Sequence, residues 1–313
     1  MLQIIIFSYN RAMQLDTLLS SLFKNWISPL FKIDVIYNDS AFCYEEAYKK
    51  LQNKYPQIIL HKECAIGDTL SFSDYLNPFN IIRIYRNPLL RKSKTNFRSL
   101  LIGVVKESKT DNIMFLTDDS MFINQVELEQ DIFDWINSSP VQRQFSLRMG
   151  VGKKKIPENV MIDDRFCIWS FLNNIDSWGY RFSVDGHIYN RHYILNLLCR
   201  NVFVNPNTLE SHLNSYVKRM MKLCEGRCFR EIKMLTFPIN MVQNSVDNIA
   251  QNVSVEMLNE QFLQDVTMEY DIPKDFDATK QYVNRLKFIQ DDGMTFYVNV
   301  NPEPTRHLKE RCQ

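Results

Sequence analysis

Asn112–Phe122, with the sequence N-I-M-F-L-T-D-D-S-M-F, is the stretch around which the rest of the chain is organised. Ile113–Leu116 is an uninterrupted apolar run, which is typical of a strand buried on both faces of a parallel sheet. Asp118 and Asp119 follow directly, and acids at the carboxyl end of such a strand lie where open α/β sheets bind ligands. Two adjacent carboxylates suit a divalent cation that also holds phosphate oxygens. A solvated acidic turn with helix-capping potential is the alternative interpretation.

Strands and helices alternate through the first third of the chain. Short apolar runs predict strands, and apolar residues at helical spacing predict the helices between them. In chain order we expect a strand at Leu2–Phe7, a helix ending near Asn25, a strand at Ile33–Tyr37, a helix at Glu45–Tyr55 and a strand at Gln57–His61. This order of elements predicts a parallel sheet with right-handed crossover connections.

Polar residues follow three of the predicted strands, at Ser8–Arg11, Asn38–Ser40 and Thr117–Ser120. Because the carboxyl ends of parallel strands point the same way, Asp39 and the acidic pair after the later strand can converge on one ligand. The chain has neither Gly-x-Gly-x-x-Gly after the first strand nor Gly-x-x-x-x-Gly-Lys anywhere. The sequence therefore argues against a classical dinucleotide site and against a P-loop.

The composition is that of a globular protein without a strong charge bias. The 313 residues are 45% hydrophobic and 23% charged, with a net charge of +1, so no global excess of charge points to nucleic acid or an anionic membrane. Seven cysteines, an odd number, favour a reducing compartment over a disulfide framework. Met1–Phe7 lacks the basic residues of a signal peptide, and no apolar stretch reaches the ~18 residues that span a bilayer. We expect a cytoplasmic protein without a transmembrane segment.

Three motifs taken together resemble those of GT-A-fold glycosyltransferases, and in particular the family 2 type enzymes that use nucleotide-sugar donors. They are F-S-Y-N-R at 7–11, Y-N-D-S at 37–40 and L-T-D-D-S at 116–120. The resemblance implies an α/β fold with a GT-A-type, Rossmann-like, mostly parallel sheet flanked by helices. We expect residues 1–240 to form the nucleotide-sugar-binding and catalytic domain. Residues 241–313 would form a helical C-terminal extension that completes the core or covers the acceptor side.

The resemblance also implies roles for the polar residues at the strand ends. Donor binding falls to the residues after the first strand, namely Ser8, Tyr9, Asn10 and Arg11. Asp39 would hold the nucleotide base, and Asp118 would lie near the ribose. Asp119, with or without Asp118, would hold Mn²⁺ or Mg²⁺ and the donor diphosphate. The family pattern is Asp-x-Asp, whereas this chain has Asp-Asp-Ser, so which carboxylate touches the metal stays open.

A basic stretch precedes the acidic motif. Residues 81–98 include six lysines and arginines, and a helix is expected to start near Thr95. Arg98 is a candidate partner for a diphosphate, because a helix N-terminus and a guanidinium group both favour anions. The same residues could form a solvated basic face. A nucleic-acid binder would need basic residues across a whole face, which the near-neutral net charge does not support.

The acceptor side and the catalytic base are expected in the following hundred residues. By the resemblance, Asp185, Gly186 and His187 lie beside the transferred sugar. Glu210 matches the position of the general base, the carboxylate that takes the acceptor hydroxyl proton in an inverting transfer. The family usually has an acidic pair there, whereas this chain has Glu210-Ser211, and Glu210 could instead cap a helix. Asp164, next to Asp163, is the second candidate for the base.

The sequence as a whole predicts a metal-dependent glycosyltransferase. It would move a sugar from a nucleotide-diphosphate donor to the hydroxyl of a glycan, lipid-linked or other acceptor, and a retaining course stays open beside the inverting one. A nucleotidyltransferase is an alternative, although Ser8–Arg11 lacks the glycine common in that class. A non-catalytic nucleotide-sugar-binding protein of the same fold is another. Tyr216–Lys233 could form an amphipathic helix at a membrane face or an ordinary surface helix.

Overall fold

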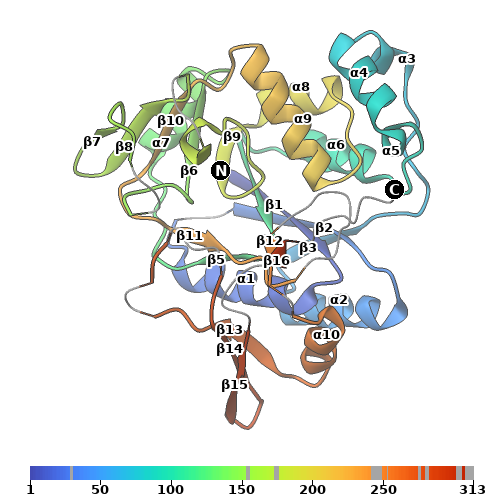
Figure 1. Cartoon of the computed structure of the whole chain (residues 1–313), viewed down its shortest axis with the longest axis vertical. Helices are drawn as coiled ribbons and strands as arrows, with labels where there is room; N and C mark the ends of the chain where they lie inside the picture. Colours follow the sequence, from blue (N-terminus) through green and yellow to red (C-terminus); the bar gives the residue numbers. More distant parts are fainter. Residues whose placement is uncertain are drawn as a thin grey trace.

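The structure is a computed structural model that describes most of the chain. The described residues are 1–28, 31–152, 156–172, 176–240, 249–251, 253–273, 276–278, 282–300 and 305–306. A central sheet runs through the molecule, with helices on both of its faces (Figure 1). None of the helices in this part of the chain has the length and hydrophobicity needed to cross a bilayer.

Within the described residues the main sheet has nine strands, in the order β3-β2-β1-β4-β9-β6-β10-β8-β7. In chain order these are β1 (Leu2–Tyr9), β2 (Phe31–Asn38), β3 (Ile58–Lys62), β4 (Asn112–Thr117), β6 (Arg143–Ser146), β7 (Met161–Ile162), β8 (Phe166–Ser170), β9 (His187–Asn190) and β10 (Glu225–Phe229). From the strand pairings, β8 and β9 run opposite to the others. The predicted α/β class with a mostly parallel sheet is confirmed.

The two central strands are buried on both faces, as their apolar runs predicted. Side chains of β1 and β4 alternate between two cores, which is the period-two geometry of a strand. One core contains Ile4, Ile6, Met114 and Leu116. The other contains Ile5, Phe7, Ile113 and Phe115. The register pairs Phe7 with Thr117 and Tyr9 with Asn38, so the carboxyl ends of three strands meet at one edge.

Helices cover each face of the sheet, as Figure 1 shows. Helices α1 (Ala12–Asn25) and α2 (Phe42–Lys54) pack on the first core. Helices α6 (Phe97–Glu107), α8 (Arg191–Arg200) and α9 (Pro206–Arg219) pack on the second. Between β3 and α6 lie three short helices, α3 (Phe72–Tyr75), α4 (Pro78–Arg86) and α5 (Pro88–Arg91). The remaining elements of this part are β5 (Ser120–Phe122), α7 (Gln130–Ser138), the 3₁₀ helix η1 (Asp176–Gly179) and β11 (Met234–Thr236), which pairs with β5.

The predicted helical C-terminal extension is wrong for the described residues. After residue 240 they hold one helix, α10 (Val255–Leu263), and five strands. The strands are β12 (Ile249–Ala250), β13 (Thr267–Tyr270), β14 (Arg285–Ile289), β15 (Thr295–Asn299) and β16 (Thr305–Arg306). Threonine, aromatic and β-branched residues recur in these strands, and such side chains fit a pleated sheet better than a helix.

The C-terminal elements pack against the first two helices. Helix α1 contacts β13 and α10, and α10 also contacts α2. Phe262, Met268 and Phe288 belong to the same core as Leu15 and Leu18 of α1. The division into residues 1–240 and 241–313 remains a prediction.

Candidate active site

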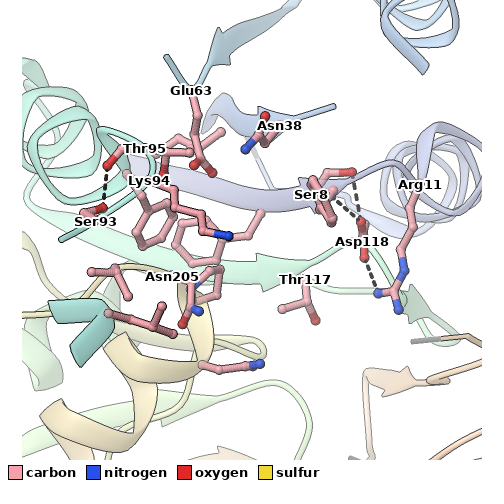
Figure 2. A pocket seen from close by; sticks show the side chains of 18 of the residues that line it. Ser8, Arg11, Asn38, Glu63, Ser93, Lys94, Thr95, Thr117, Asp118 and Asn205 are labelled. Carbon is pink, nitrogen blue, oxygen red and sulfur yellow. Dashed lines mark hydrogen bonds and ion pairs between the residues drawn. The ribbon is translucent and has the colours of Figure 1, made fainter. Parts of the chain in front are cut away.

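A cavity of about 400 Å³ opens at the carboxyl ends of β1, β2 and β4 (Figure 2). Ser8, Asn38 and Asp118, all labelled in the figure, come from these three strand ends. The residues just before α6 and the start of α9 form the opposite wall. This is the edge at which the sequence predicted a ligand, because parallel strands direct their carboxyl ends to one side of a sheet.

Asp118 is held on both of its carboxylate oxygens. Its Oδ2 accepts hydrogen bonds from Ser8 Oγ at 2.9 Å and from the Tyr9 backbone N–H at 3.2 Å. Its Oδ1 accepts from Arg11 Nη1 at 3.0 Å. Ser8 is itself fixed by a 2.6 Å hydrogen bond between its hydroxyl and that of Tyr48. Asp118 is therefore a buried anchor that ties the end of β1 to the end of β4.

Arg11 is the cation of this cluster. Besides Asp118, its Nη1 lies 3.7 Å from Asp119 Oδ2, and its Nη2 donates to the backbone carbonyl of Asn240. Burial opposes the charged form, but Asp118 and Asp119 outweigh it and hold the pKa of Arg11 above its usual value. A positive charge is thus fixed at the floor of the cavity by two carboxylates and one carbonyl.

Asp119 is less completely satisfied than its neighbour. Its Oδ1 is buried and accepts no hydrogen bond from any described residue. Burial raises the pKa of Asp119 to about 6, and the negative charges of Asp118 and Asp185 act in the same direction against Arg11. An unsatisfied buried carboxylate oxygen is a group that a bound cation would stabilise.

The divalent metal that the sequence predicted would need free carboxylate oxygens at this edge of the sheet. Among the described residues no three histidine, cysteine, aspartate or glutamate side chains are grouped as a metal site. Mg²⁺, however, is commonly held by one or two carboxylates together with water and substrate phosphates. Asp119 fits such a ligand through its unpaired Oδ1, whereas both oxygens of Asp118 already accept hydrogen bonds. The chemistry of the donor set therefore fits a metal that a phosphate ligand helps to hold.

At the other end of the cavity the lining differs from the predicted one. Asn38 and Glu63 line it, whereas Asp39 does not. Asp39 Oδ2 instead lies 2.9 Å from Lys62 Nζ. Burial raises the pKa of Glu63, although a hydrogen bond with Thr95 lowers it. Asn38 stands within the Y-N-D-S motif and Glu63 directly follows β3, but neither was singled out by the sequence.

Two further predicted donor residues have structural partners. Asn10 adopts a positive φ of 57°, which asparagine tolerates, and its Oδ1 accepts from the Ser40 N–H at 2.9 Å. Arg98 forms a bidentate pair with Asp74, at 3.0 and 2.7 Å, and does not line the cavity. Lys92 and Lys94 line the cavity instead, and neither forms an ion pair with the described residues.

A second cavity, of about 380 Å³, adjoins Glu210 and His187. Asp185 lines neither cavity but links a residue of each wall by hydrogen bonds. Its Oδ1 accepts from Thr117 Oγ1 of the first cavity at 2.8 Å, and its Oδ2 accepts from Arg148 Nη1 of the second at 2.7 Å. Gly186 has a positive φ of 69°, and His187 Nδ1 lies 2.8 Å from Gln144 Oε1.

Glu210 lies inside α9 and does not cap it, because Asn205 occupies the cap and accepts from the Thr208 N–H at 2.8 Å. The Val184 backbone N–H donates to Glu210 Oε1 at 3.0 Å. Burial and the charge of Asp185 raise the pKa of Glu210 to about 7, against the opposing effects of Ser183, Val184 and Arg148. A carboxyl group that titrates near neutral pH is suited to proton transfer.

Asp164, the second candidate for the base, is not brought to either cavity. It is exposed in the turn between β7 and β8 at the far edge of the sheet. Its neighbour Asp163 accepts backbone hydrogen bonds from Arg165 and Phe166 at 2.8 and 2.6 Å, which shape that turn. Of the predicted site residues, the structure therefore gathers Ser8, Tyr9, Arg11, Asp118 and Asp119 in the first cavity and His187 and Glu210 in the second.

Comparisons with known proteins found similar structures only. No protein-family model matches the sequence, and no curated protein matches it significantly. The fold is similar to a crystal structure of S. aureus TarS 1–349 in complex with UDP-GlcNAc, with 14% identity over 79% of this chain and a TM-score of 0.46. It is also similar to TarS 1–349 in complex with UDP, with 17% identity over 74% of this chain and a TM-score of 0.42. The chain covers 62% and 59% of the length of these two TarS chains.

Proposed function

We propose that the protein is a glycosyltransferase that takes a nucleotide-diphosphate sugar as its donor. The observation that carries the proposal is that two cavities have walls linked through one side chain, Asp185. The first contains a fixed cation beside one buried and one half-buried aspartate, and the second contains a glutamate whose pKa lies near 7. Asp185 links the two walls, so a donor in one cavity and an acceptor in the other would meet beside it.

The first cavity suits the nucleotide diphosphate. Asn38 and Glu63 lie at one end of this cavity, as Figure 2 shows, and would offer amide and carboxyl groups to a base. Lys92 and Lys94, which form no ion pair within the part of the chain that the structure describes, would offer ammonium groups to phosphate oxygens. Asp119 would hold Mn²⁺ or Mg²⁺ there, and a bound divalent cation neutralises charge on a leaving diphosphate. Arg11 keeps Asp118 and Asp119 oriented toward this part of the cavity.

The second cavity suits the acceptor. In this proposal Glu210 takes the proton of the acceptor hydroxyl as the oxygen attacks the anomeric carbon of the donor sugar. The new oxygen–carbon bond forms as the bond to the diphosphate breaks, and attack from the opposite side inverts the anomeric centre. Arg148 and Asp185, paired at 2.7 Å, would fix the acceptor side relative to the donor.

Nucleotide binding is the first test of the proposal. Thermal unfolding would be measured with nucleoside diphosphates and nucleotide sugars, UDP and UDP-GlcNAc among them, with and without Mn²⁺. A ligand at about 100 times its dissociation constant stabilises a protein by about 2.7 kcal/mol, a shift of roughly 5 °C. We expect such a metal-dependent shift for the unmodified protein and its loss in Asp119→Asn.

Asp164→Asn is the matched control, since it removes an exposed aspartate that lines neither cavity. This variant should respond to nucleotides like the unmodified protein. Absence of a shift with every nucleotide would contradict the proposed donor site. Release of free nucleoside diphosphate from the donor then distinguishes an enzyme from a binding protein of the same fold.

A further inference from the structure

Helices α3, α4 and α5 form a unit at one corner of the molecule, and Figure 1 shows it at the upper right. Helix α3 contacts α4, and α4 contacts α5. This unit exposes an unusual number of large apolar side chains. They include Phe72, Leu76, Ile81, Ile82, Tyr85 and Leu89. Phe72 is 80% exposed and Tyr85 83% exposed, so these are not core residues at the edge of a buried cluster.

The exposed residues of α4 occupy one face of the helix. Ile81, Ile82 and Tyr85 are separated by helical spacing and point away from the protein. The opposite face is buried through Asn80 and Ile84. Helix α4 is thus apolar on its inner side and also on its outer side, which a helix at a water-exposed surface does not require.

The unit is firmly attached to the body of the protein. The side chains of Asn77 and Asn80 both donate to the Arg200 carbonyl, at 2.8 and 3.1 Å. Arg83 Nη1 donates to Asn201 Oδ1 at 2.7 Å. Ile84 and Leu90 are buried with Val202 in a small core of their own. These contacts therefore hold the exposed apolar face of α4 in a fixed position on the protein.

Basic residues surround this face. Arg86, Arg91, Lys92 and Lys94 are exposed, and none of them forms an ion pair with the described residues. Asp74, the single acidic residue of the segment 71–94, is buried and paired with Arg98. The chain as a whole has a net charge of +1, so this is a local concentration of positive charge.

The ends of two neighbouring helices extend the surface. Phe79 of α4 packs edge-on against Tyr216 of α9 at 5.6 Å, and the Arg219 guanidinium lies 5.4 Å from the Phe79 ring centre. Beyond Arg219, Met220 and Met221 are 44% and 53% exposed. Apolar and basic side chains therefore continue side by side from α4 to the end of α9. We call these residues, 72–94 with 216–221, the docking surface.

We propose that the docking surface binds the surface of a membrane that contains anionic lipids. Exposed aromatic and aliphatic side chains would enter the boundary between headgroups and acyl chains, while Arg86, Arg91 and Arg219 contact lipid phosphates. Nucleic acid would use the positive charge but would leave Phe72, Ile82 and Leu76 without a role. The docking surface also reaches the first cavity, because Leu89, Lys92 and Lys94 line it.

Co-sedimentation with lipid vesicles tests the docking surface and requires no nucleotide. Vesicles of phosphatidylcholine alone would be compared with vesicles that contain equal parts of phosphatidylcholine and phosphatidylglycerol. We expect at least tenfold tighter binding to the anionic vesicles, weakened at high salt because ions screen the basic side chains. Equal binding to both kinds of vesicle, or no binding to either, would overturn the proposal.

Variants locate the binding to this face. Ile82→Asp/Tyr85→Asp should weaken binding to anionic vesicles at least tenfold, since it places two carboxylates on the outer face of α4. Arg86→Gln/Arg91→Gln should lose the preference for anionic lipid while keeping the apolar face. Met294→Asp/Tyr297→Asp is the matched control, with two exposed apolar residues on the β14–β15 hairpin at the opposite end of the molecule (Figure 1).

The control should bind vesicles like the unmodified protein, and all variants should keep its melting temperature. If the α4 variant binds as well as the unmodified protein, the proposal is wrong. A second copy of the chain is the competing occupant of this face. Sedimentation velocity would show it as a concentration-dependent dimer that Ile82→Asp/Tyr85→Asp converts to monomer, and that result would also overturn the proposal.

Discussion

At the scale of a single residue, we expect Glu210 to set the pH dependence of the proposed activity. Its pKa of about 7 reflects burial and the facing charge of Asp185, with Arg148, Ser183 and the Val184 N–H acting against them. Because only the carboxylate can accept a proton, kcat/KM should rise with pH through about 7 and level off above it. Glu210→Gln should lower kcat by about 10²–10⁴. A flat pH profile, or full activity in Glu210→Gln, would exclude Glu210 as the base.

The same residue should weaken the folded protein at alkaline pH. A carboxyl whose pKa is raised by folding binds its proton more tightly in the folded state, so ionisation opposes folding. The unmodified protein should lose stability as pH rises from the ordinary glutamate range to about 7. Glu210→Gln removes that loss and should gain about 1–3 kcal/mol at pH 8 and little at pH 5. Urea unfolding at both pH values measures the difference, and equal gains would contradict this account.

Arg11 should be essential to the fold of the site. It is the cation between Asp118 and Asp119, and its side chain is 10% exposed. Removing one partner of a buried charged cluster typically costs about 3–5 kcal/mol, because the remaining charges stay buried without compensation. We expect that loss in the urea unfolding of Arg11→Met. Arg11→Lys keeps the positive charge but lacks the forked donors of the guanidinium group. Its stability should therefore lie between that of the unmodified protein and that of Arg11→Met. An unchanged unfolding midpoint in Arg11→Met would show that the carboxylates do not need this cation.

At the scale of the element, the strand cores and the ends of β1 and β4 could be predicted, whereas the end of β2 could not. Because every position of Ile113–Leu116 is apolar, the sequence predicted a buried strand there. The structure has it as β4, in which all four residues are buried. Which side chain at a tip faces the ligand depends on where the strand ends, since successive residues point to opposite faces. Strand β2 continues to Asn38, which lines the cavity, while Asp39 pairs with Lys62. Arg98 pairs with Asp74, a partner that the sequence did not indicate because Asp74 lies on a short helix with no sequence period.

The turn before β9 requires a glycine at position 186. Its φ is +69°, and a Cβ there would lie 2.1 Å from Met234 Sδ. Although the methionine end can move, the backbone strain remains, so Gly186→Ala should cost about 1–3 kcal/mol. Gly103→Ala in α6 is the control, since a Cβ there meets nothing within 4 Å. It should gain about 0.5–1 kcal/mol from helix propensity. Thermal unfolding of both variants checks the opposite signs, and equal shifts would contradict the assignment.

At the scale of the whole molecule, the C-terminal part contains strands that the local sequence pattern did not predict. Strand β13 has only four residues, too few for a period to separate strand from helix. Its partner β14 follows only after a connection of fourteen residues, from 271 to 284. No short turn motif therefore indicates in the sequence that the two strands pair. What places β13 is burial against α1, where Thr17 Oγ1 donates to the Met268 carbonyl at 2.8 Å. Tertiary contacts of this kind place strands around α10, where the sequence predicted a helical extension.

Cooperative unfolding can test whether residues 241–313 are a separate domain. All four tryptophans precede residue 240, so tryptophan fluorescence reports the first part of the chain alone. Leu286 is fully buried in the core that also holds Leu15 and Leu18, and truncating such a residue typically costs about 2–5 kcal/mol. Because this core is continuous, Leu286→Ala should shift the fluorescence and circular dichroism transitions by the same amount in urea.

Met294→Ala is the control for that experiment, since Met294 is 62% exposed and should leave both transitions unchanged. If Leu286→Ala instead lowers the dichroism transition and leaves the fluorescence transition in place, the two parts unfold independently. The boundary at residue 240 would then be that of a real domain. A common shift would mean that α10 and β13–β15 complete the core on which α1 rests. Because Arg11 precedes α1 directly, the C-terminal part would then also support the position of the cation in the first cavity.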